Sequence, residues 1–286
     1  MGERTLTALV LALVLAAVLA IQVARPLLRR RRRAHLQRVP LPRAWRQIVH
    51  RHVAFYSDMP PDLRQRLDGL IQVFLDEKRF VGCAGLAIND TIRIVIAAHA
   101  CALLVNRPGG CFDAVQTVLV YPDAFYVDHE QVDESGVVHR DRHLLSGESW
   151  EEGQVVVSWD DALDDVAHPG DGQNVVIHEF AHQLDGESGS VNGAPVIEDA
   201  RLLARWGRTM REEFDALNRA LERDEHTLID PYGATEPAEF FAVVSEHFFE
   251  MPGALRDEHP QLYRRMREFY RIDPAQWPGE RHGRHT

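Results

Sequence analysis

Cysteine is scarce in this 286-residue chain, and the few cysteines present are not arranged for cross-linking. The chain has three, Cys83, Cys101 and Cys111, which is an odd number without any Cys-x-x-Cys spacing. This pattern suggests neither a framework of disulfides nor a cysteine-based zinc knuckle. We interpret the three residues as reduced, buried thiols of a cytosolic domain.

Beyond residue 38, basic residues are outnumbered by acidic ones. Residues 1–38 contain eight arginines and one acidic residue and carry +7, whereas the whole chain carries −11, so residues 39–286 carry −18. Such an acidic segment argues against non-specific binding of nucleic acid, and we predict no nucleic-acid partner. The cluster Arg29–Arg33 could bind nucleic acid, but its place beside a long apolar run favours anionic lipid headgroups.

That apolar run covers residues 5–24, which contain no charged side chain and are numerous enough to cross a bilayer as one helix. The arginine cluster follows the run, and the positive-inside rule then places the downstream chain in the cytoplasm. A cleaved secretory signal is the alternative, but it would have its basic segment in front and a small-x-small site behind. We predict a single-pass protein of the inner membrane, with a transmembrane anchor (1–24), a basic juxtamembrane linker (25–42), a cytoplasmic domain (43–277) and a disordered tail (278–286).

The patterning of the domain predicts an α+β fold. A helix opens at Pro60-Pro61-Asp62 with an apolar stripe, and residues 91–105 are apolar almost all round, as in a buried helix. His99 lies in that second helix and is expected to be a satisfied core histidine. The predicted strands are residues 83–88, 115–121, 124–127, 137–139 and 154–159. Because helices dominate after the last strand, we expect a small mixed or antiparallel sheet and a mainly helical C-terminal half.

The most informative segment is His178-Glu179-Phe180-Ala181-His182. An apolar run leads into it, and no residue within it breaks a helix. In a helix the two histidines lie one turn apart on one face, where both imidazoles can bind one Zn²⁺. Glu179 then projects about 100° further round, within reach of a water at the metal, as a metal-assisted peptidase needs. Two solvated histidines on an ordinary helix are the alternative.

A third ligand has to come from later in the chain. The pattern His-Glu-x-x-His-x-x-Gly-x-x-His is absent, because Asp185 and Ser188 stand where it needs glycine and histidine. Residues 236–250 offer carboxylates instead. Glu239 follows Pro237 within a first helical turn, where the helix dipole favours an ionised carboxylate. Three other carboxylates compete for this role, and spacing does not decide between them: Glu236, Glu246 and Glu250.

Tyr232 stands seven residues before Glu239, in Asp230-Pro231-Tyr232-Gly233. A tyrosine hydroxyl near the metal could stabilise the oxyanion of a tetrahedral intermediate. The local sequence alone favours the plainer interpretation, a tyrosine packed in a turn.

Together these motifs resemble the Mlc titration factor A family of zinc peptidases, whose catalytic part is similar to that of anthrax lethal factor. The similarity covers residues 43–275. It rests on His178–Asp185, on Tyr232 and Glu239 in a Pro-Ala-Glu-Phe-Phe-Ala context, on Ser245-Glu246-x-Phe248-Phe249, and upstream on residues 96–101, 147–150 and 157–160.

The resemblance implies a zincin-like metallopeptidase with one Zn²⁺ per chain. It implies His178, His182 and Glu239 as zinc ligands, Glu179 as the general base and Tyr232 as the group that stabilises the transition state. It also implies peptide or protein substrates, often of the aminopeptidase type, and binding of a glucose-responsive transcriptional repressor in enteric relatives. Those relatives lack a membrane span, which puts the repressor partnership in doubt here. A regulatory binding protein with a secondary zinc site is the rival hypothesis.

Overall fold

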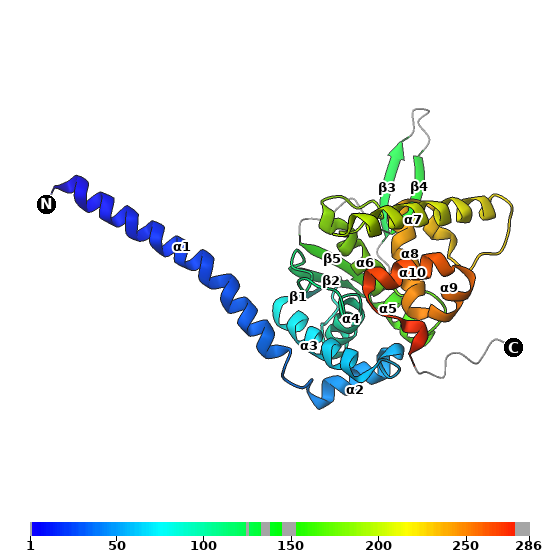
Figure 1. The fold of residues 1–286 in the computed structure, drawn as a ribbon, viewed down its shortest axis with the longest axis horizontal. Coiled ribbons are helices and arrows are strands. Elements are labelled where there is room, and N and C mark those ends of the chain that lie inside the picture. The colour runs from blue at the N-terminus through cyan, green and yellow to red at the C-terminus, as the bar shows by residue number, and fades with distance from the viewer. Residues whose placement is uncertain (1, 124–125, 133–137, 145–152, 278–286) are drawn as a thin grey trace.

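Figure 1 shows the computed structural model, which describes residues 2–123, 126–132, 138–144 and 153–277 and, in parts of α1 and in β3 and β4, the backbone without the side chains. The predicted disordered tail, residues 278–286, lies outside these ranges. The elements run in the order α1 (Glu3–Leu36), α2 (Arg43–His52), α3 (Pro61–Glu77), β1 (Arg79–Gly82), α4 (Asp90–Ala102), β2 (Thr117–Tyr121), β3 (Tyr126–Val132), β4 (Val138–Leu144), β5 (Gln154–Ser158), α5 (Trp159–Ala167), α6 (Val175–Asp185), α7 (Ala200–Leu221), α8 (Pro237–Glu250), α9 (Pro252–Glu258) and α10 (Pro260–Tyr270).

The sheet inside the domain is parallel, which corrects the predicted mixed or antiparallel sheet. Its strand order is β1-β2-β5, with Arg79 opposite Thr117 in the first pair and Thr117 opposite Gln154 in the second. Helix α4 is the crossover between β1 and β2 that neighbouring parallel strands require. Alternate valines of β2 and β5 are buried: Val118, Val120, Val155 and Val157. Hydrophobic patterning located these strands but does not encode their direction, which is why the prediction was wrong.

Antiparallel pairing within the described residues is confined to the β3–β4 hairpin, which projects from the domain in Figure 1. The strand predicted at residues 83–88 is also wrong, because β1 ends at Gly82. A Cβ at Gly82 would lie 1.9 Å from the carbonyl oxygen of Leu86, and the intervening Ala84 and Gly85 have positive φ values of 47° and 83°. The chain therefore turns back on itself where the apolar pattern suggested a strand.

The helices confirm the mainly helical α+β prediction and enclose the site. Helix α3 begins at Pro61 as predicted, and α4 buries its residues from Ile94 to Ala102. His99 is 4% exposed, and its Nδ1 lies 3.0 Å from the carbonyl oxygen of Val95, so it is the satisfied core histidine that was expected. Helix α8 is buried from Ala238 to Glu250 and packs against α6. These two buried helices carry the candidate site.

Helix α1 extends away from the domain and continues to Leu36, through the first part of the predicted linker (Figure 1). The predicted spanning helix at residues 5–24 is not supported, since no helix in the described part of the chain is both long and apolar enough to cross a membrane. At its C-terminal end α1 is held by the domain. Carboxylates of α3 and of the loop before β2 pair with three of the arginines assigned to lipid: Arg29 and Arg33 bind Glu77 and Asp113, and Arg32 binds Asp76.

Candidate metal centre

Helix α6 carries His178, Glu179 and His182, and its N-terminal cap fixes where the helix begins. Asn174 caps the helix, with its Oδ1 accepting a hydrogen bond of 3.0 Å from the N–H of Ile177. All three side chains are buried, and the ring centroids of the two histidines are 4.8 Å apart. Phe180 points into the core, with its ring 4.8 Å from that of Phe112. The packing of this apolar side fixes the rotation of α6, and with it the direction of both imidazoles.

Helix α8 supplies the carboxylate. Pro237 occupies its first turn, and Glu239 follows there with 3% of its surface exposed. The start of this helix packs closely against Gly193. The φ of Gly193 is +76°, and a Cβ at this position would lie 2.3 Å from the carbonyl oxygen of Pro237. Any larger residue at position 193 would push against the turn that carries Glu239.

Three nitrogen and oxygen atoms converge between α6 and α8. His178 Nε2 lies 3.2 Å from His182 Nε2 and 2.9 Å from Glu239 Oε2, and His182 Nε2 lies 3.4 Å from Glu239 Oε2. A tetrahedral zinc ion with bonds of roughly 2.0–2.1 Å holds its ligands about 3.3 Å apart. The three separations match that spacing, so the donor set fits a single small metal ion.

The hydrogen bonding of these atoms also points to a cation. Glu239 Oε2 is buried and, within the described residues, accepts no hydrogen bond of good geometry despite its closeness to both rings. A buried carboxylate oxygen without a donor is costly unless a cation lies against it. Burial opposes ionisation of Glu239, but the neighbouring imidazoles outweigh it and lower the pKa of this carboxyl group. The group is therefore held in the anionic form that a ligand needs.

Glu246 lies behind the first histidine. Its Oε1 lies 2.8 Å from His178 Nδ1, the ring nitrogen that faces away from the three-atom cluster. Burial opposes charging of His178, but Glu246 and Glu239 raise its pKa well above the usual range. A carboxylate on the second ring nitrogen fixes the orientation and tautomer of a metal-bound histidine. Glu246, a competitor for the ligand role on spacing alone, thus occupies a supporting position in this structure.

Asn174 joins this support to the start of α6. Its backbone N–H donates to Glu246 Oε2 at 2.6 Å, and its Nδ2 donates to Glu250 Oε1 at 3.1 Å. Glu250, the second competing carboxylate, also accepts from the N–H of Gly170 at 3.1 Å. The third competitor, Glu236, is exposed at the N-terminal cap of α8.

Asp185 ties the end of α6 to the segment that follows. It is fully buried, and its Oδ2 accepts a hydrogen bond of 2.6 Å from the N–H of Gly193. The carbonyl oxygen of Gly193 in turn accepts from Trp206 Nε1 on α7, at 3.2 Å. Asp185 stands three residues after His182, so the shared helix face was the signal that sequence reasoning could have used to find its supporting role.

The two remaining predicted residues lie beside the cluster. Burial raises the pKa of Glu179 to about 6, against the opposing effect of both imidazoles. Tyr232 lies in a short 3₁₀ helix, Pro231–Ala234, where its N–H donates to Asp230 Oδ1 at 2.8 Å. Its ring centroid is 5.9 Å from that of His178, and 39% of the residue is exposed. It is thus both a turn residue and an exposed neighbour of the candidate site.

Comparison with known proteins supplies the family. Residues 27–271 match the family described as "Glucose-regulated metallo-peptidase M90". This chain belongs to the M90 family. An uncharacterized protein of Synechocystis is 41% identical over 236 residues, which cover 82% of this chain and 86% of the relative. Mlc titration factor A of Pectobacterium atrosepticum is 36% identical over 225 residues (78% and 84%), and that of Klebsiella pneumoniae is 34% identical over 235 residues (81% and 87%).

Membership of the M90 family confirms the resemblance seen in the sequence and carries a coarse function. The M90 chain is a metallopeptidase, for which a metal ion and peptide or protein substrates are implied. The structure adds a candidate binding site for that ion, since His178, His182 and Glu239 are the residues of the described chain whose ligand atoms gather within 4.8 Å of one another.

Proposed function

We propose that this M90 chain is a zinc-dependent peptidase in which His178, His182 and Glu239 bind the metal. The proposal is carried by the convergence of three buried ligand atoms at the spacing of a tetrahedral metal site. Zinc is favoured among divalent metals because two imidazoles and one carboxylate are a common ligand set of catalytic zinc sites, which keep a fourth position open.

The chemistry follows from where the other side chains lie. When bound, zinc supplies a Lewis acid that polarises a carbonyl and lowers the pKa of water. Glu179, buried beside the ligands, accepts a proton from the attacking water and passes it to the nitrogen of the leaving amine. The hydroxyl of Tyr232 donates to the carbonyl oxygen as negative charge develops there. Glu246 keeps the ring of His178 in place throughout.

The substitution Glu179→Gln tests this assignment. The variant should keep its zinc and lose about 10²–10⁴-fold in activity, because the shape is retained and the proton acceptor is not. Zinc quantitation and a fluorogenic peptide library measure the two effects, and Glu198→Gln, at an exposed glutamate, is the matched control. Full activity at full zinc content in Glu179→Gln would contradict the mechanism. Peptides with free and with blocked N-termini separate the proposed aminopeptidase mode from endopeptidase cleavage.

A second candidate function is regulatory binding, which the name of two relatives, Mlc titration factor A, favours. In that case the chain would sequester a transcriptional repressor, and hydrolysis would be secondary. The same Glu179→Gln variant separates the two, since it should keep a regulatory effect in cells if binding alone matters. Loss of the effect together with peptidase activity would leave hydrolysis as the function.

The membrane location and the cytoplasmic orientation stay predictions, supported by the sequence of residues 5–33 alone. They are tested by fractionation of cells that express the full chain, followed by protease treatment of spheroplasts and of inverted vesicles. Recovery of the chain in the soluble fraction, or digestion of the domain from the outside of spheroplasts, would contradict them. Binding of Arg29–Arg33 to anionic lipid would have to compete with Glu77 and Asp113, which pair with Arg29 and Arg33 in the structure.

A further inference from the structure

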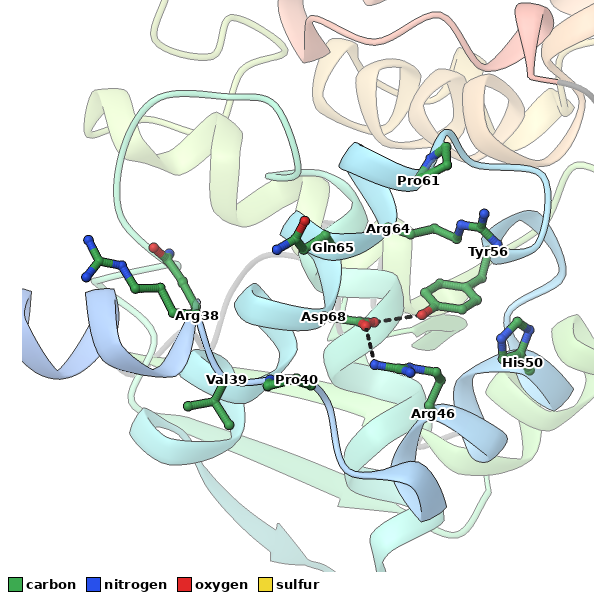
Figure 2. A pocket seen from close by; sticks show the side chains of 11 residues that line it. Arg38, Val39, Pro40, Arg46, His50, Tyr56, Pro61, Arg64, Gln65 and Asp68 are labelled. Carbon is green, nitrogen blue, oxygen red and sulfur yellow. Dashed lines mark hydrogen bonds and ion pairs between the residues drawn. The ribbon is translucent and has the colours of Figure 1, made fainter.

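A cleft lies where the end of α1, helix α2 and helix α3 meet (Figure 2). It has a volume of about 490 Å³, within the range of small-molecule sites. Its lining comes from residues 37–68 and includes none of the three candidate metal ligands, so the proposed peptidase function does not account for it.

The two buried residues of the lining form a polar pair. Tyr56 and Asp68 are 3% and 8% exposed, and the Tyr56 hydroxyl donates to Asp68 Oδ1 at 2.7 Å. Arg46 on α2 approaches the other oxygen of Asp68, with its Nη2 3.4 Å away. Both donors are drawn toward Asp68 in Figure 2. Each oxygen of the single carboxylate that lines the cleft thus already has a donor beside it.

Positive charge remains after this pairing. Arg64 stands one turn before Asp68 on α3, is half-buried, and lies beside Tyr56 in Figure 2. No carboxylate in the described part of the chain forms an ion pair with Arg64, and Arg46 uses only one long contact of the five N–H donors that a guanidinium offers. His50 completes this side, with its ring edge-on to Tyr56 at 4.8 Å.

We propose that this cleft binds a phosphate group, either that of a soluble phosphate ester or that of a phospholipid headgroup. Arg46 beside Asp68 and Arg64 beside Tyr56 provide planar, paired N–H donors of the kind that phosphate oxygens accept. A phosphate monoester carries close to two negative charges at neutral pH, and its oxygens can accept from Arg64 and from the N–H donors of Arg46 that do not contact Asp68. Asp68 holds Arg46 in place and leaves Arg64 as the main contact.

The cleft lies at the connection between α1 and the domain, which is compatible with either source of the phosphate group. Gln37, Val39 and Pro40 line it and belong to the segment that joins α1 to the domain. Gln72 holds this segment, with its Nε2 donating to the carbonyl oxygen of Val39 at 2.6 Å. A bound phosphate would therefore lie against the connection between α1 and the rest of the molecule.

Calorimetric titration of the full chain tests it, with inorganic phosphate, glycerol phosphate and a short-chain phosphatidic acid kept below its micelle concentration as probes. We expect saturable binding that Arg64→Gln weakens about tenfold, which corresponds to one charge-assisted contact. Arg43→Gln is the matched control, because it removes the same charge from an exposed position on α2 that does not line the cleft. Arg46→Gln is the second variant, and urea unfolding of each checks that the fold is kept.

Each outcome of this titration either supports the phosphate site or overturns it. Saturable binding of all three probes, weakened by Arg64→Gln and not by Arg43→Gln, supports a general phosphate site. Binding of phosphatidic acid alone, with the same dependence on Arg64, assigns the lipid source, and binding of the two soluble probes alone assigns the free ester. No saturable binding of any probe overturns the proposal, as does an equal effect of Arg43→Gln and Arg64→Gln, which would indicate a diffuse basic surface.

Discussion

At the scale of single residues, the candidate centre depends on carboxylates that do not bind the metal themselves. Glu246→Gln should weaken zinc binding about 10–100-fold, because the neutral amide holds His178 Nδ1 less strongly and no longer offsets the charge of the ion. Competition with a chromogenic chelator measures the affinity. Glu236→Gln is the control, since Glu236 is exposed at the N-terminal cap of the same helix. Equal zinc affinity in wild type and Glu246→Gln would remove Glu246 from the site.

A second residue-scale effect belongs to the core and concerns stability in acid. Burial and, to a smaller extent, the nearby His52 lower the pKa of His99 to about 4. The hydrogen bond with the carbonyl group of Val95 opposes this shift. The native state therefore binds fewer protons than the unfolded chain, and stability falls as pH drops from about 6.5 toward 4. The loss attributable to His99 is about 3 kcal/mol.

His99→Leu should remove this part of the acid sensitivity. Urea unfolding between pH 7 and 4 in the presence of a chelator measures it, so that release of metal does not contribute. The free energy of unfolding of the variant should fall about 3 kcal/mol less than that of wild type over this interval. His226→Leu, at an exposed histidine, should behave as wild type does. Parallel pH profiles for wild type and His99→Leu would show that His99 titrates normally.

At the scale of elements, the sequence predicted those helices whose start and apolar face are determined by neighbouring residues. Helix α3 was predicted from Pro61 and its stripe, and α6 from an apolar run leading into His178. The direction of β2 and β5 was not predictable, because alternation of valines is the same in parallel and antiparallel strands. The role of Glu246 was not predictable either, since its choice between ligand and support depends on how α8 crosses α6, a contact between residues 68 positions apart.

The sequence predicted that the arginines near the end of α1 bind lipid, whereas in the structure Arg29 and Arg33 bind carboxylates of the domain. Glu77 is half-buried, and although burial opposes it, hydrogen bonds from Arg33 and Arg29 lower its pKa to about 2. Glu77→Gln should loosen the C-terminal end of α1 by about 1 kcal/mol and speed tryptic cleavage at Arg29–Arg33 about fivefold. Asp62→Asn, at an exposed residue of the same helix, is the control. Unchanged cleavage rates in Glu77→Gln would mean that these ion pairs do not hold the helix.

At the scale of the whole molecule, the metal would join α6 to α8, the two buried helices around which the domain is built. Zinc at a thousand times its dissociation constant adds about 4 kcal/mol to the free energy of unfolding, so its removal should lower the melting temperature by roughly 8–16 °C. Calorimetry with and without a chelator measures the shift. His182→Asn should melt at the same temperature in both conditions, because one of the three ligands is gone. A wild-type protein that melts identically with and without zinc would show that the ion does not bind between these helices, and that the fold rests on their packing alone.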